Sequence, residues 1–168
     1  MRFIILLMLV QSVVTVRAQN SAELNKRNGF KNIKLGYPID SVKGYLFKQD
    51  LKEKGEFPVK QYTVDHEDYK KIGDVAVQDI QLLTYQNLIY KIFVTTDKDP
   101  RLMKALEKAF GKATFVVRSG TYNWKAENLS LYFLAGKSSI ELTYRSYPLI
   151  AKMKADKNRK IDVIADDF

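Results

Sequence analysis

The only histidine of the chain, His66, stands in an acidic run with Asp65, Glu67 and Asp68. Carboxylates and an imidazole can ligate cations, so this run is the one place where a hard cation could bind. However, no second histidine exists for a zinc site, no EF-hand spacing is present, and adjacent side chains at a strand end point in different directions. The run is more typical of a solvated loop, and the sequence predicts neither a metal ion nor a cofactor.

Hydrolytic chemistry would need either a nucleophilic triad or two facing carboxylates. A triad would have to use His66, but the Gly-x-Ser-x-Gly turn that presents such a serine does not occur. A glycosidase needs two carboxylates about 5 to 9 Å apart. Asp74, Asp79, Glu127 and Glu141 are available, but the sequence does not show that any two converge. The chain has no cysteine for thiol chemistry and no phosphate-binding glycine loop.

Aromatic residues are more numerous in the predicted strands than two helices can cover. Tyr132 alternates with the apolar Leu131 and Phe133, so we expect its side chain on the face opposite the helices. Tyrosine, tryptophan and arginine dominate binding hot spots. We therefore predict a recognition surface on the open sheet face, with Tyr122, Trp124, Tyr132 and Arg145 as its binding residues. The alternative is that the tail, a dimer partner or a second layer covers this face.

Two halves of the chain repeat one order of elements, a helix followed by antiparallel strands. The predicted helices span 38–51 and about 100–110. The predicted strands are 57–65, 75–85, 88–96, 114–118, 121–125, 129–135 and 139–146. Short polar links at 86–87 and 135–138 indicate hairpins. The sequence thus predicts an α+β fold, in which two helices pack on one face of an antiparallel sheet of about seven strands, built as an imperfect duplication.

Short motifs at the ends of the predicted helices resemble a recurring pattern of exported bacterial domains. Leu35-Gly36 with Pro38 precedes the first helix, and Phe110-Gly111 ends the second. The strands around Tyr122-Asn123-Trp124 resemble those that close uncharacterised periplasmic proteins of this kind. The layout is also distantly similar to the SmpA/OmlA family of outer-membrane assembly lipoproteins and to the tandem-repeat β-lactamase inhibitory proteins. The chain lacks the lipidated cysteine of the first group and the disulfides of the second, so the resemblance implies the fold alone.

The first eighteen residues have the features of a secretory signal. Arg2 precedes an apolar run from Phe3 to Val16, and cleavage is predicted between Ala18 and Gln19. This run is shorter than the roughly 20 residues that cross a bilayer, so no transmembrane segment is predicted in the mature chain. The predicted organisation is a signal peptide at 1–18, a mobile lead at 19–28, an α+β domain at 29–147 and a charged helix or tail at 148–168.

The mature chain would be basic. Two of the 28 Lys and Arg residues lie in the leader, so 26 minus 19 acidic residues leaves about +7. This charge favours anionic partners, and export makes nucleic acid an unexpected one. We predict an exported, periplasmic or secreted, non-catalytic binding or adaptor module for an envelope protein or an anionic envelope component. A small periplasmic hydrolase acting on glycan or lipid, and an inhibitor of a secreted enzyme, stay open as alternatives. The sequence does not predict the oligomeric state.

Overall fold

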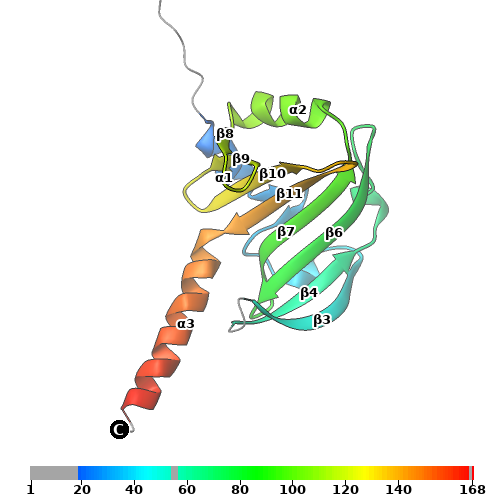
Figure 1. Cartoon of the computed structure of the whole chain (residues 1–168). Helices are drawn as coiled ribbons and strands as arrows, with labels where there is room; N and C mark the ends of the chain where they lie inside the picture. Colours follow the sequence, from blue (N-terminus) through cyan, green and yellow to red (C-terminus); the bar gives the residue numbers. More distant parts are fainter. Residues whose placement is uncertain (1–18, 54–56, 167) are drawn as a thin grey trace, which may run out of the picture.

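A computed structural model of the chain describes residues 19–53, 57–166 and 168, and within them nine strands form one antiparallel sheet (Figure 1). The strand order is β3-β4-β6-β7-β11-β10-β9-β8, and β5 pairs with β6 beside this path. These strands are β3 Tyr45–Glu53, β4 Phe57–Val64, β5 Lys71–Ile72, β6 Val75–Tyr85, β7 Leu88–Asp97, β8 Thr114–Val116, β9 Thr121–Lys125, β10 Leu129–Ala135 and β11 Ser139–Ser146. Two further strands, β1 Gly29–Phe30 and β2 Ile33–Lys34, form a separate hairpin. The predicted signal peptide, which ends at Ala18, lies outside the described residues.

Each half of the chain supplies four antiparallel strands to this order, and the halves meet where β7 pairs with β11. The predicted hairpins at 86–87 and 135–138 are confirmed by the β6–β7 and β10–β11 pairings. Leu82, Ile92, Leu142 and Leu131 project to one side of the sheet and are almost fully buried there. This side holds the main hydrophobic core.

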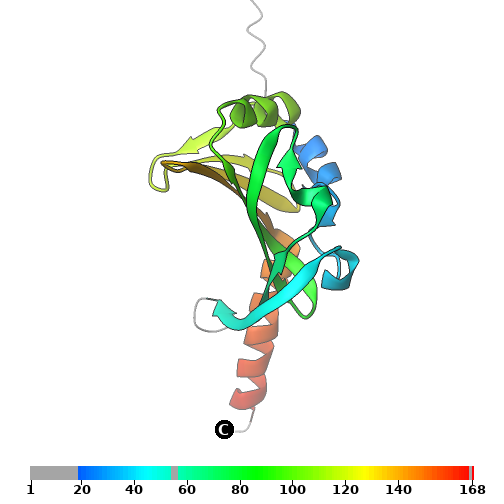
Figure 2. The same cartoon turned by 90° about the vertical axis from the view of Figure 1, so that its right-hand side faces the viewer.

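The described helices are α1 Ser21–Arg27, α2 Arg101–Phe110 and α3 Tyr147–Ala165, with short 3-10 turns η1 Ile39–Ser41 and η2 Glu67–Tyr69. The sheet is curved, and α1 and the segment 29–42 lie on its convex side (Figure 2). On this side, Leu24 of α1 and Leu102 and Phe110 of α2 are buried in the main core. The α+β class and the antiparallel sheet are thus as predicted, whereas the helix and strand numbers differ.

The predicted helix at 38–51 is wrong, because this segment forms only η1 and then the edge strand β3. Gly44 has a φ of +69°, and a Cβ on it would lie 2.2 Å from the carbonyl oxygen of Asp65. Gly44 thus has a left-handed backbone conformation and lies against the backbone of Asp65. A helix cannot continue through a residue in this conformation, so only the short turn before it forms. The chain then runs into β3, which pairs with β4 along its length. The first half of the chain therefore has no counterpart of α2 here.

The polar lead at 19–28, predicted to be mobile, instead contains α1. The Asn20 side chain accepts a hydrogen bond from the backbone N–H of Glu23, which caps the helix at its N-terminus. Leu24 is 1% exposed. The side chain of Gln19 donates to the carbonyl oxygen of Asn123 at 3.0 Å and accepts from the N–H of Lys125 at 3.0 Å. One buried leucine and these hydrogen bonds attach a segment that looks too polar to fold.

The predicted C-terminal helix forms as α3, whose first turns cover one end of the concave side of the sheet. Leu149 and Met153 are buried there in a second, smaller cluster with Val59, Tyr85 and Tyr90. The last turns extend away from the sheet (Figure 1). The helix is held at the sheet end by Asp156, which accepts hydrogen bonds from Tyr85, Lys152 and Arg159.

We expect Asp156→Asn to weaken this attachment in a pH-dependent manner. The hydrogen bond from the Tyr85 hydroxyl, with the cations beside it, holds the pKa of the Asp156 carboxyl below its ordinary value. The stabilisation is therefore complete above the unfolded pKa of about 3.9 and is lost as the pH falls through the lower folded pKa. Urea unfolding should show wild type more stable than the variant at pH 7, with the difference shrinking below about pH 4. The exposed Asp162→Asn on the same helix is the control, and a pH-independent difference would contradict the expectation.

Candidate functional site

Three rows of side chains cross the concave side of the sheet, which we call the concave face. Directly paired residues of antiparallel strands project to the same side, so the strand register defines each row. The rows are Asp79, Thr95 and Glu141; Gln81, Phe93, Thr143 and Tyr132; and Leu83, Lys91, Arg145 and Ser130. Outside the end covered by α3, charged, amide and aromatic groups lie together on this face.

Only two of the four predicted binding residues lie on this face. Tyr132 and Arg145 are there, but Trp124 pairs with Leu131 and Tyr122 with Phe133, so both project to the convex side. Trp124 is fully buried, and its Nε1–H donates to the carbonyl oxygen of Gly111 at 2.8 Å. Trp124 is thus a core residue. Tyr122 lies at the sheet margin, with its ring centroid 4.8 Å from that of Phe115.

Arg145 lies in a hollow of about 320 Å³, which we call the cationic hollow. The hollow is lined by Lys91, Phe93, Ser119, Thr121, Tyr132, Thr143 and Arg145. The Arg145 guanidinium carbon lies 5.7 Å from the centroid of the Tyr132 ring, within cation–π range. Its Nε is buried without a hydrogen-bond partner, and among the described residues the side chain forms no hydrogen bond or ion pair. Arg145 is therefore held by ring contact while its donors stay unused.

Lys91, the other cation of this hollow, is already paired. Glu53 at the end of β3 accepts hydrogen bonds from the Lys91 ammonium and the Tyr90 hydroxyl. Burial raises the pKa of the Glu53 carboxyl, but these two bonds outweigh burial and hold the pKa below its ordinary value. Burial and the bond to Glu53 raise the pKa of Tyr90. Glu53 forms its ion pair with Lys91 and acts on Arg145 only through a longer-range attraction, so Arg145 is the cation of the hollow that has no ion pair in the described chain.

A second hollow of about 310 Å³ adjoins the first, and we call it the acidic hollow. It is lined by Leu51, Gln61, Asp79, Gln81, Leu83, Phe93, Thr95 and Glu141. Gln49 donates to Gln61, Gln61 to Gln81 and Gln81 to Asp79, each at 2.6 Å. Asp79 and Glu141 flank Thr95, and within the described chain neither carboxylate forms an ion pair. The hollow therefore presents two charged acceptors beside an ordered row of amides.

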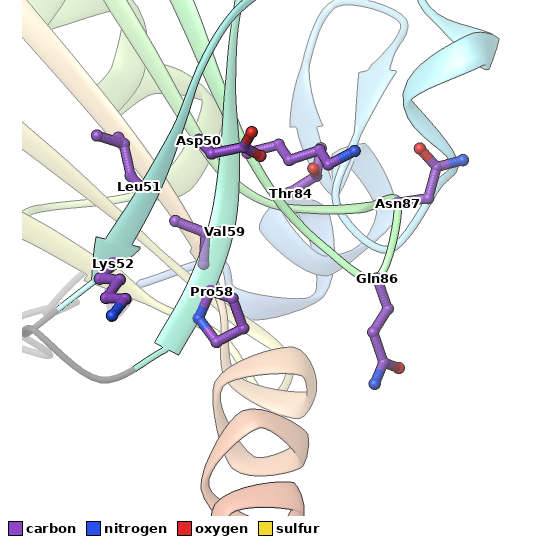
Figure 3. Close-up of a pocket in the computed structure, with 9 residues that line it drawn as sticks. Asp50, Leu51, Lys52, Pro58, Val59, Thr84, Gln86 and Asn87 are labelled. Carbon is purple, nitrogen blue, oxygen red and sulfur yellow. The ribbon is translucent and has the colours of Figure 1, made fainter.

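A larger hollow, of about 560 Å³, lies elsewhere, between the β3–β4 pair and the β6–β7 turn (Figure 3). Thr84 in its wall is buried, and its hydroxyl has no partner. However, Lys52, Gln86 and Asn87 point away from one another (Figure 3). Because these three polar side chains do not converge on one point, we favour the concave face as the functional site.

His66 lies outside all of these hollows and has a structural role at the start of η2. Its Nδ1 accepts a hydrogen bond from the backbone N–H of Asp68 at 3.2 Å. The neighbouring carboxylates pair with lysines, Asp65 with Lys70 and Asp68 with Lys43. In the described part of the chain, no group of three or more potential ligand side chains is placed to hold a metal ion. No helix in that part is long and apolar enough to span a bilayer.

Comparison with known proteins found no match for this chain among family models, curated proteins or solved structures.

We expect Trp124→Phe to destabilise the fold without affecting ligand binding. The variant removes the hydrogen bond to Gly111 and leaves a small cavity, which should lower the free energy of unfolding by about 1 to 3 kcal/mol. Urea unfolding followed by circular dichroism measures this change. Tyr122→Phe, at the partly exposed margin, is the control and should change the value by less than about 0.5 kcal/mol. Unchanged stability in Trp124→Phe would refute a core role for this residue.

Proposed function

We propose that this protein is an exported, non-catalytic binding module whose concave face binds an anionic group of an envelope component or envelope protein. The observation that carries the proposal is Arg145, whose guanidinium lies over the Tyr132 ring and forms no hydrogen bond in the described chain. A purely structural arginine at this depth is normally paired, because a buried donor without a partner costs about 1 to 3 kcal/mol. A bound carboxylate, phosphate or sulfate would accept hydrogen bonds from the terminal guanidinium N–H groups of Arg145, which have no partner among the described residues.

The surroundings of Arg145 suit such a ligand. Guanidinium groups bind planar or tetrahedral oxyanions through paired, charge-assisted hydrogen bonds. Hydroxyls of Ser119, Thr121 and Thr143 line the same hollow and can contribute further hydrogen bonds. The predicted charge of about +7 for the mature chain would attract anionic partners toward the site at low salt.

We expect Arg145→Gln to weaken ligand capture at least tenfold, because charge-assisted hydrogen bonds contribute about 1.5 to 3 kcal/mol. The measurement is capture of envelope extract on immobilised residues 19–168, with proteins, lipids and saccharides identified after elution with rising salt. Lys104→Gln on α2 removes the same charge from an exposed position on another element and should capture as wild type does. Equal capture by Arg145→Gln and Lys104→Gln would refute the proposal.

Glycan hydrolysis is a second candidate function, favoured by one observation. Asp79 and Glu141 line one hollow and are separated by a single strand, which places their Cα atoms about 10 Å apart. Carboxyl groups on such a frame can approach the spacing that glycosidases use. The histidine-based version of a hydrolase has less support, since His66 caps η2 outside the concave face.

If the hydrolase alternative holds, wild-type protein should release new reducing ends from an acidic polysaccharide, and the double variant Asp79→Asn, Glu141→Gln should lose this activity. His66→Ala should retain it. For a binding module we expect no release by any of the three proteins above a buffer control. Activity in wild type that the double variant loses would replace the non-catalytic proposal.

A further inference from the structure

The cationic and acidic hollows adjoin each other at Phe93, and we call the two together the trough. Phe93 lines both of them, and Thr143 of the cationic hollow donates a hydrogen bond to Glu141 of the acidic hollow at 3.1 Å. Arg145 follows Glu141 by four residues on β11, which corresponds to about 13 Å along an extended strand. A ligand that occupies both hollows must therefore be longer than a single sugar ring.

The trough is electrically asymmetric. Arg145 is the unpaired cation at one end, while Asp79 and Glu141 are carboxylates without ion pairs at the other. A uniformly anionic chain would be attracted by the first end and repelled by the second. The trough instead matches a ligand with an anionic group at one end and hydrogen-bond donors at the other.

We infer that this ligand is an acidic oligosaccharide, in which a carboxylate-bearing sugar meets Arg145 and a hydroxyl-rich neighbour meets the acidic hollow. This inference rests on the proposed function and specifies its ligand class. Sugar hydroxyls donate to carboxylates and amides, and Asp79, Glu141 and Gln61 present such acceptors in the acidic hollow. The partly exposed ring of Phe93 lies between the two ends and offers an apolar surface to the C–H face of a sugar.

A peptide fits the trough less well. It would have to place a carboxylate at Arg145 and a cationic side chain at the acidic hollow, and its backbone would need partners along the sheet. The concave-face strands β6, β7, β11 and β10 already pair on both sides within the sheet. The accessible polar groups of this face are therefore mainly side chains, which suits hydroxyl recognition better than strand addition.

The test is isothermal titration of residues 19–168 with 3′-sialyllactose, whose one carboxylate lies on a terminal sugar, and with the neutral trisaccharide maltotriose. We expect wild type to bind 3′-sialyllactose at least tenfold more tightly than maltotriose, and Arg145→Gln to lose most of this preference. The double variant Asp79→Asn, Glu141→Gln should bind 3′-sialyllactose at least threefold more weakly than wild type, since its neutral acceptors form weaker hydrogen bonds to hydroxyls. Asp40→Asn, Glu127→Gln removes two exposed carboxylates from other surfaces and should bind as wild type does.

The direction of change in the double variant decides the inference. Tighter binding of 3′-sialyllactose would show that the two carboxylates repel the ligand, and the assignment of hydroxyls to the acidic hollow would be overturned. No binding of 3′-sialyllactose by wild type would overturn the saccharide class. In either case, envelope capture that still depends on Arg145 would leave the proposed function standing, whereas capture independent of Arg145 would refute both.

Discussion

The pairing of β7 with β11 is the constraint on which both the core and the candidate site depend. It joins the two halves of the chain through a register that runs from Ser139 opposite Asp97 to Arg145 opposite Lys91. On the convex side this register sets Val94 beside Leu142 in the main core. On the concave side the same register sets Lys91 beside Arg145. Because a slip of one residue would exchange the two faces, burial of the core also fixes the composition of the site.

An irregularity in the pairing of β6 with β7 helps to bring Lys91 and Glu53 together as an ion pair on the concave face. The register between β6 and β7 shifts at Leu83/Thr84, so β7 has an extra residue at this point. Tyr90 and Lys91, which are adjacent in sequence, both reach Glu53 as a result. In a regular strand they would project to opposite sides. Glu53 and Lys91 lie at the end of the concave face that is next to α3. At this end α3 covers the second apolar cluster, and the trough ends there.

The strands of the second half could be predicted from the sequence, because the alternation of apolar and polar residues that marks a strand is visible within the strand itself. The bounds predicted for 121–125, 129–135 and 139–146 coincide with β9, β10 and β11. The segment 38–51 was not predictable in this way, since the conformation of Gly44 depends on its contact with Asp65 about twenty residues later. Trp124 was assigned to the wrong face for a similar reason. Its side depends on pairing with Leu131, and composition carries no information on register.

Most of the site residues that were not predicted could have been placed on the concave face from a feature of the sequence. Lys91, Phe93 and Thr95 alternate with the apolar Ile92 and Val94, so the two-residue period of a strand places these three side chains together on the face opposite to the apolar ones. The alternation of side chains along a strand does not reveal which charged residues lack an ion pair, because ion pairs depend on contacts between strands that are distant in the sequence. Glu53 reaches Lys91 from the distant edge strand, while Arg145 is fixed by Tyr132 without an acceptor. A cation that the fold holds in place without an ion pair loses little conformational entropy when it binds an anion. This pre-organisation favours affinity for the ligand, whereas an ion pair within the protein would instead have favoured the stability of the fold.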